Sequence, residues 1–448
     1  MASALAITEP RNQTPHESAR SWHLLKCRDF GFLFAGQAIS QIGDGLNRVA
    51  LLWFVYELTG SALKTTTIGL LQTLPPLIFG PLIGVFLDRW PKKRAMVWVD
   101  LIRTLMVALI PVLYTLQLLT LERLYLLVFL TSIFSTVFGP ALASAVPLIV
   151  SRSQLTGANA LIQTTTTIGI LVGPAISGLG IAMIGAQNVL YVNAATFFIS
   201  VLCLLPIRIR EIRLVSDCPT KQASVLSELL AGFRFVFLQH RTVFALMIMT
   251  ALYTVGTSAF VFLLPPVAKK ILHIGPTELG WLWSAMGVGM LLSTAWLAWA
   301  RQSSLSCRLK IIAVSLGVGG MAVCGFGMVH STILSAAMVL LIGSSTAIFI
   351  PLVWAVLQEV TPEQMLGRVF TMFSTSGMAA AMIGMAVFGW AADAISPGAS
   401  LLGVGGFLFA AACFAVNFSF RCAQGERVPA ARPRVLRKLS VQTTASRA

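Results

Sequence analysis

Four charged residues lie inside stretches of the chain that are otherwise apolar, and they are the residues best placed to do chemistry. Asp44 and Arg48 stand four positions apart, and Asp100 and Arg103 stand three apart. Residues at these spacings share one face of a helix, so each acid has a cation within reach. A charge at the centre of a membrane-spanning helix costs about 2.5–3.5 kcal/mol on insertion scales, which makes such residues candidates for function.

We predict that Asp44 is a protonatable carboxylate in a central cavity and that Arg48 tunes its pKa. Asp44 lies over a dozen residues into its apolar stretch, which predicts a position deep in the membrane. Asp100 and Arg103 are nearer to the cytoplasmic end of theirs and are assigned to a gate region. The alternative is that both are structural ion pairs whose only role is mutual neutralisation.

The composition predicts the elements that must carry these residues. Of the 448 residues, 56% are apolar and 11% are charged, and the mean hydropathy is +0.83. A soluble domain carries about 25% charged residues and cannot hide so much apolar surface from water. These values exclude a soluble enzyme, a disordered chain and a disulfide scaffold. They predict an all-α membrane protein, because the apolar runs are continuous and helix-length.

Twelve apolar stretches reach the length of about 20 residues that a spanning helix needs. They lie near 31–57, 66–87, 95–117, 123–147, 159–182, 186–207, 242–265, 276–299, 309–329, 331–357, 368–391 and 398–420. Most of the 32 Lys and Arg fall in the terminal segments and in alternate loops, whereas the other loops hold only Lys64, Arg123, Lys269 and Lys270. The positive-inside rule therefore places both termini in the cytoplasm. Because the net charge of +16 is spread between apolar runs, the predicted partner is membrane lipid and not nucleic acid.

The longest loop divides the chain into two halves. We predict a cytoplasmic segment at 1–30, a six-helix half at 31–207, a cytoplasmic linker at 208–241, a second six-helix half at 242–420 and a basic cytoplasmic tail at 421–448. Polar loops follow the fourth span of each half, which indicates an internal repeat. Two related six-helix halves are an architecture that transporters use.

The loop between the second and third spans holds the strongest local pattern, in which an acid at a helix end precedes a basic cluster. The positive-inside rule explains the basic residues but not the acid. The pattern resembles the major facilitator superfamily signature G-x-x-x-D-R/K-x-G-R-R/K. The matching residues of this sequence are Gly84, Asp88, Arg89, Lys92, Lys93 and Arg94, and Pro91 stands where the signature has its second glycine. The resemblance implies two pseudo-symmetric six-helix bundles and a cytoplasmic gate. In that gate Asp88 would meet the start of the eleventh helix, near Gly367 and Arg368.

The fifth span contains a second pattern of small residues, with Gly169, Gly173, Pro174 and Gly178. Small residues at such spacing let helices approach closely, so packing is one interpretation. The pattern is also similar to the G-x-x-x-G-P-x-x-G-G motif of proton-driven drug exporters in the superfamily. Ser177 replaces one of the glycines of that motif. The fourth span also lacks the buried Arg of those exporters, and this absence is a departure from their standard mechanism of proton coupling.

Segments 40–45, 52–61, 138–141 and 367–370 are similar to the enterobactin-exporter and macrolide-efflux branch of the superfamily. This resemblance implies a secondary active exporter of an amphiphilic organic compound, such as a siderophore or a macrolide, driven by inward proton flow. It also implies a monomer in a bacterial inner membrane that works by alternating access. An importer or uniporter of a small metabolite, and a non-transporting scaffold or sensor, are the alternatives.

Polar and aromatic residues on the inner helices are the predicted substrate contacts, because such side chains line adaptable pockets for organic ligands. They are Gln37, Gln41, Asn47, Gln163, Trp283 and Trp354. A packing role is the alternative for each of them. No enzymatic activity, cofactor or metal site is predicted, and the sequence has no phosphate-cradling G-x-x-x-x-G-K-[ST] motif for ATP.

Overall fold

The computed structural model describes residues 21–151, 154–208, 241–300, 305–329, 331–362 and 365–423. The side chains of 21–22, 81–82, 84–89, 241, 368 and 421–423 are not part of that description. The predicted terminal segments and linker therefore lie largely outside it. Within the described ranges the chain is helical, and no strand occurs in them.

The described residues of the first half form one short 3-10 helix and six long α-helices. They are η2 (Ser21–Lys26), α1 (Arg28–Thr59), α2 (Ala62–Arg89), α3 (Lys92–Thr115), α4 (Leu121–Ile149), α5 (Leu155–Ile184) and α6 (Ala186–Leu204). The described residues of the second half form six long helices and one π-helical turn. They are α8 (Arg241–Val267), η5 (Ala268–Leu272), α9 (Pro276–Trp299), α10 (Leu305–Phe326), α11 (Thr332–Val360), α12 (Leu366–Ala394) and α13 (Pro397–Ala423).

Ten of these helices, α3–α6 and α8–α13, are long and apolar enough to cross a membrane. The two others, α1 and α2, contain 32 and 28 residues and pack in the same bundle. The charged side chains of α1, among them Asp44, Arg48 and Glu57, lower its apolar character. The chain is a multi-pass membrane protein, as its composition predicts.

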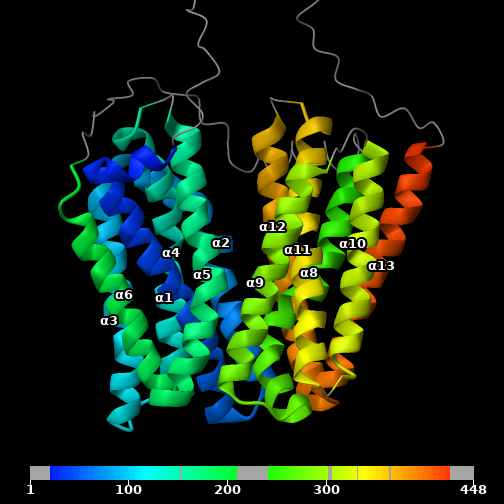
Figure 1. Cartoon of the computed structure of the whole chain (residues 1–448), viewed down its shortest axis with the longest axis horizontal. Coiled ribbons are helices and arrows are strands. Elements are labelled where there is room, and N and C mark those ends of the chain that lie inside the picture. Colours follow the sequence, from blue (N-terminus) through cyan, green and yellow to red (C-terminus); the bar gives the residue numbers. More distant parts are fainter. Residues whose placement is uncertain are drawn as a thin grey trace, which may run out of the picture.

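The same helix pairs pack together in both halves. In the first half α1 packs against α5 and α6, α3 against α4 and α6, and α2 against α4. In the second half α8 packs against α12 and α13, α10 against α11 and α13, and α9 against α11. Adding seven to both helix numbers of a pair in the first half gives the matching pair in the second half, so the two halves share one architecture. Figure 1 shows them as two bundles side by side, with the start of α1 and the end of α13 at the same end.

The two halves meet through α5 with α9 and through α2 with α12. Their ribbons diverge at the end of the molecule that holds the start of α1 and the end of α13, and they converge at the opposite end (Figure 1). Close packing explains the convergence: a Cβ on Gly178 of α5 would lie 2.5 Å from the Pro276 carbonyl oxygen and 3.1 Å from the Gly280 Cα of α9. We call this the closed end of the molecule.

The other glycines of the fifth-span pattern pack within the first half. A Cβ on Gly173 would lie 2.7 Å from the Cα of Gly45 on α1, and one on Gly169 would meet the Gln41 carbonyl oxygen. The pattern therefore joins α5 to α1 along one face and to α9 at the closed end. Both contacts need backbones that approach more closely than any side chain allows.

Gly178→Val should weaken the closed end, because its side chain has no space between α5 and α9. In a background without native cysteines, we expect a membrane-impermeant maleimide to label Thr277→Cys on α9 several-fold faster in this variant. Gly317→Val on α10 is the matched control, since no neighbour lies within 4 Å of a Cβ there. Equal labelling rates in the two variants would contradict this account of the closed end.

Candidate functional site

Arg103 of α3 binds two carboxylates at once. One of its terminal nitrogens lies 2.6 Å from the Asp44 carboxylate of α1, and the other lies 3.4 Å from that of Asp100. The second oxygen of Asp100 accepts a hydrogen bond of 2.7 Å from the Ser200 hydroxyl of α6. The Arg103 guanidinium also lies over the Phe197 ring, 3.8 Å from its centroid. The network ties together α1, α3 and α6 of the first half.

The two carboxylates of the network differ in their access to solvent. The Asp100 side chain is fully buried, whereas that of Asp44 is 33% exposed. Asp100 has both oxygens engaged, by Arg103 and by Ser200. Asp44 is therefore the carboxylate of the pair that a proton can reach from the cavity beside it.

The structure differs from the pairing that the spacing on α1 predicts. Asp44 forms its ion pair with Arg103 of α3, and Arg48 forms no ion pair with a carboxylate among the described residues. The physical reason is the forked guanidinium of Arg103: Asp100 and Phe197 hold it in place, so its free end reaches across to α1. Arg48 instead lies over the ring of Trp283 on α9, 5.9 Å from its centroid. The expected pair of Asp100 and Arg103 is present.

Three cavities adjoin these charges. A cavity of about 270 Å³ has Asp44, Arg103 and polar side chains of α2 and α4 in its wall. A second, of about 440 Å³, lies between α1, α2 and α8, and both Asp44 and Arg48 line it. A third, of about 190 Å³, is lined by Arg48 and by residues of α8–α11 and α13. Arg48 thus stands between the two halves and borders space on both sides.

The structure places the predicted substrate contacts unequally. Gln41 and Asn47 line the cavity of about 440 Å³, and Asn47 also lines the cavity of about 270 Å³. Trp283 is buried beside Arg48, and Gln37 is buried in α1. The remaining two, Gln163 and Trp354, are exposed, and Trp354 packs edge-on against Phe370.

Several residues that line the cavities were not predicted from the sequence. Gln72 of α2 lines two of the cavities, and the second half contributes Thr257, Met286, Met290 and Thr346. Gln72 is a polar residue in an apolar run, a signal that could have singled it out. The threonines and methionines carry no comparable signal, because such residues are common in spanning helices.

A carboxylate at the closed end joins the two halves. Asp393, at the end of α12, accepts hydrogen bonds from the backbone N–H groups of Ala62 (2.7 Å) and Leu63 (3.1 Å), at the start of α2. The Ser61 hydroxyl donates to the same carboxylate. An acid there satisfies free N–H groups and interacts favourably with the helix dipole. The sequence analysis missed this contact.

A lysine reinforces the closed end from the second half. The Lys269 ammonium lies 3.3 Å from the Glu57 carboxylate of α1 and 4.6 Å from the centroid of the Trp53 ring. The ion pair is exposed, so we assign it less energy than the cap by Asp393. Together these groups join the ends of α1 and α2 to the end of α12 and to η5.

The predicted cytoplasmic gate lies at the opposite end. Gly84, Asp88 and Arg89 belong to the last turns of α2, but their side chains fall outside the described part, as does that of Arg368. Lys92 and Lys93 open α3, and the Lys93 ammonium donates to the Leu205 carbonyl oxygen at 2.6 Å, while Arg94 is exposed. A Cβ built on Gly367, at the start of α12, would meet no atom within 4 Å.

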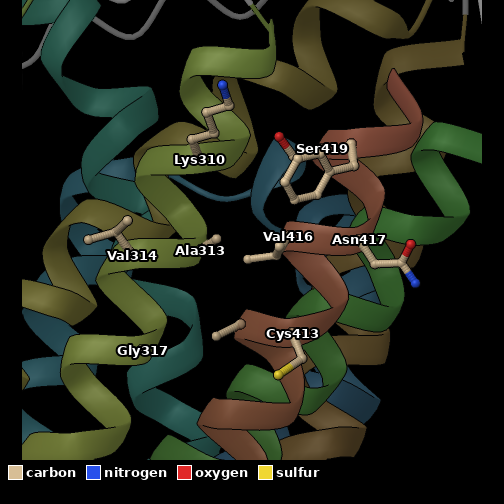
Figure 2. A pocket seen from close by; sticks show the side chains of 10 residues that line it. Lys310, Ala313, Val314, Gly317, Cys413, Val416, Asn417 and Ser419 are labelled. Atoms are coloured by element: carbon tan, nitrogen blue, oxygen red, sulfur yellow. The ribbon is translucent and has the colours of Figure 1, made fainter. Parts of the chain in front are cut away.

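A further groove is unrelated to this network. It has a volume of about 850 Å³ and lies between α10 and α13 on the outer face of the second half. Figure 2 shows Lys310 at one end of it and mostly apolar side chains, such as Val314 and Val416, along its walls. Such a face suits contact with lipid tails, so we place the functional site in the central cavities instead.

The ion pairs of Arg103 predict that substitutions of Arg103 and Arg48 lower the stability by different amounts. Arg103→Gln leaves two carboxylates without their cation, one of them fully buried, and should lower the free energy of unfolding by about 3–5 kcal/mol. Arg48→Gln should cost much less, because Arg48 has no carboxylate partner in the described structure. Denaturant unfolding of both purified variants in detergent measures the difference. The reverse order would indicate that Arg48, and not Arg103, neutralises Asp44.

Comparison with known proteins agrees with the fold. The sequence matches the family described as Major Facilitator Superfamily over residues 33–385. It is 28% identical over 368 residues to the multidrug efflux pump Tap of Mycolicibacterium fortuitum, which covers 80% of this chain and 88% of that one. It is 26% identical to macrolide efflux protein A of Streptococcus pyogenes (85% and 92% covered) and 28% identical to the enterobactin exporter EntS of Shigella boydii (83% and 87% covered).

Solved structures show the same fold at low sequence identity. A point mutant of the nucleoside transporter NupG superposes with a TM-score of 0.68 at 13% identity, covering 88% of this chain and 98% of that one. A bacterial homologue of the iron transporter ferroportin gives 0.67 at 16% identity over the same shares. The family match extends over most of the sequence and agrees with the repeated helix packing of the two halves. This protein therefore belongs to the Major Facilitator Superfamily and is a membrane transporter.

Proposed function

We propose that this transporter exports an amphiphilic organic compound in exchange for protons. The observation that carries the proposal is the Asp44 carboxylate, which is partly exposed in a central cavity and paired with Arg103. Relatives named for multidrug, macrolide and enterobactin export support the outward direction. The polar and apolar mixture of the cavity walls fits a compound with both kinds of surface.

We infer the orientation from the distribution of Lys and Arg, which places both termini in the cytoplasm. The closed end then faces outward, and the central cavities belong to a state that is open toward the cytoplasm. In this scheme residues 31–207 and 242–420 are the two moving halves, joined by the linker 208–241. Rocking of one half against the other gives access to each side in turn.

The network offers a route for coupling protons to this motion. With Asp44 charged, Arg103 binds two carboxylates and fixes α1 against α3. Protonation of Asp44 removes one charge of that set and leaves Arg103 with Asp100 alone. Because the attraction between the opposite charges of Asp44 and Arg103 is lost, α1 is then held less firmly. The proton would bind when the cavity faces outward and leave when it faces inward.

The proposed gates act at the two ends of the same helix pair. Asp393 of α12 caps the start of α2 in the state described here. In the opposite state, Asp88 of α2 would approach the start of α12 near Gly367, as the sequence motif predicts. A carboxylate at a helix N-terminus contributes about 0.3–1 kcal/mol when exposed and more when partly buried. Contacts of that size can hold a gate and still allow it to open.

Accumulation of a panel of siderophores and macrolides, in cells with and without the protein, tests the proposed export. We expect lower accumulation of at least one compound when the protein is present, and a protonophore should reverse the difference. Higher accumulation would instead indicate an importer or a uniporter. No change for any compound would contradict export of this class and leave the scaffold alternative.

Asp44→Asn should reduce proton-coupled export at least tenfold while the protein still folds, because Arg103 keeps Asp100 as a partner. The measurement is the export of a substrate from that panel, in inverted membrane vesicles with an imposed pH gradient. Glu122→Gln, in the first turn of α4, is the matched control because it removes an acid outside the cavities. Undiminished coupled export by Asp44→Asn would remove this carboxylate from the coupling mechanism.

Asp393→Ala should increase the population of the outward-open state, because the start of α2 loses its cap, a contribution of about 0.5–2 kcal/mol. Asp393→Asn is the conservative control, since an amide oxygen still accepts from the Ala62 N–H group. Nitroxide labels at Leu58 and Ile395, which are both exposed, report the opening through electron–electron distances. Identical distance distributions in wild type and Asp393→Ala would show that this contact does not hold the gate.

A further inference from the structure

Arg48 is a cation deep in the molecule that the coupling network does not use. Its nearest acid along α1, Asp44, forms its ion pair with Arg103 at 2.6 Å. Arg48 itself has an exposed side chain, because two of the central cavities adjoin it. Within the described residues, the aromatic group that its guanidinium faces is the ring of Trp283. A cation at this depth is costly in a membrane protein unless an anion or water meets it.

The surroundings of Arg48 are suited to the apolar part of a ligand. Besides Arg48, the cavity of about 190 Å³ is lined by Phe260, two methionines, five aliphatic side chains and two threonines, and no acidic residue of the described chain lines it. The adjoining cavity of about 440 Å³ adds the polar side chains of Gln41, Asn47 and Gln72. Among its described lining residues the acid is Asp44, which forms its ion pair with Arg103. Arg48 is therefore the charged side chain in these cavity walls that forms no ion pair with a described residue.

We propose that Arg48 is the recognition site for an anionic group on the substrate, so that the transported compound is an amphiphilic organic acid. A carboxylate, a phenolate or a similar oxyanion would take both ends of the guanidinium fork. The apolar body would lie against Met286, Met290 and the rings nearby, since methionine and aromatic side chains adapt to varied shapes. This inference rests on the proposed export of an organic compound and narrows its substrate class.

The position of Arg48 also gives the anion a role in the motion. Arg48 belongs to α1 of the first half, and Trp283 belongs to α9 of the second. An acid bound at Arg48 therefore sits where the two halves meet, beside the cavity wall of the second half. The proton and the substrate would therefore bind at different places. The proton would bind to the Asp44 carboxylate, which pairs with Arg103, and the substrate would bind to Arg48.

Two xanthene dyes of opposite charge test the inference by direct binding. Fluorescein is an anion at neutral pH, and tetramethylrhodamine methyl ester is a cation on the same ring scaffold. Fluorescence anisotropy with the purified full-length protein in nanodiscs of neutral lipid gives both affinities. We expect wild type to bind fluorescein at least tenfold more tightly than the cation. Arg48→Gln should remove that preference, and Arg48→Lys should keep part of it.

Lys310→Gln is the matched control, because it removes a positive charge from the outer groove of Figure 2 and leaves the central cavities intact. Its affinity for fluorescein should equal that of wild type. Size-exclusion chromatography shows whether each variant is folded, and Arg48→Lys keeps the test valid if Arg48→Gln does not fold. Equal binding of both dyes by wild type, no binding of fluorescein, or unchanged binding by Arg48→Gln would each overturn the inference.

Dye movement in inverted vesicles separates this inference from the proposed function. Concentrative uptake of the cationic dye without the anionic one would support export and overturn the acid site. Binding of fluorescein that depends on Arg48, without transport of either dye or of any compound in the panel, would support the acid site and contradict export.

Discussion

One guanidinium shared by two carboxylates organises the first half of this transporter. Charged side chains in a spanning bundle need opposite charges and hydrogen-bond partners close by. Arg103 shares its positive charge between Asp100 on its own helix and Asp44 on α1, while Ser200 of α6 binds the second oxygen of Asp100. The helices that carry these groups are thereby fixed to each other. Of the two carboxylates, Asp44 is the one that lines a cavity, and we therefore propose it as the group that exchanges a proton.

The two halves are joined by contacts of a different kind. Gly178 and Gly280 allow the backbones of α5 and α9 to touch, and Asp393 of α12 satisfies free N–H groups of α2. Neither contact involves the central charges, so the halves can separate at the closed end without disrupting Arg103. In the proposed opposite state, α2 and α12 would meet at the other end, where Asp88 and Gly367 belong to the two helices. A carboxylate and a helix start at each end are the elements that two alternating gates require.

The sequence alone was enough to predict the helices and the two-bundle architecture, because apolar length and the alternation of basic loops depend on the membrane and not on partner residues. The glycines of α5 could be identified for the same reason, since their spacing is local. The partner of Asp44 could not be predicted. Helical spacing detects only neighbours on one helix, and the competing cation lies 59 residues away on α3. The Asp393 contact spans 331 residues and carries no local signal, because an acid at the end of a spanning helix is common.

The loss of the expected Asp44–Arg48 pair changes what the site can transport. Had Arg48 neutralised Asp44, the cavity between the halves would offer a ligand no free charge, and an uncharged compound would fit as well as an acid. Because Asp44 pairs with Arg103, Arg48 forms no ion pair and, in our proposal, attracts an anion. The charge of the ligand then affects which direction of transport the membrane potential favours, since moving one charge across a potential of 100 mV changes its free energy by about 2.3 kcal/mol. An interior-negative potential favours the exit of an organic anion and opposes its entry. For such a substrate, the charge left free at Arg48 and the outward direction proposed for transport support the same function.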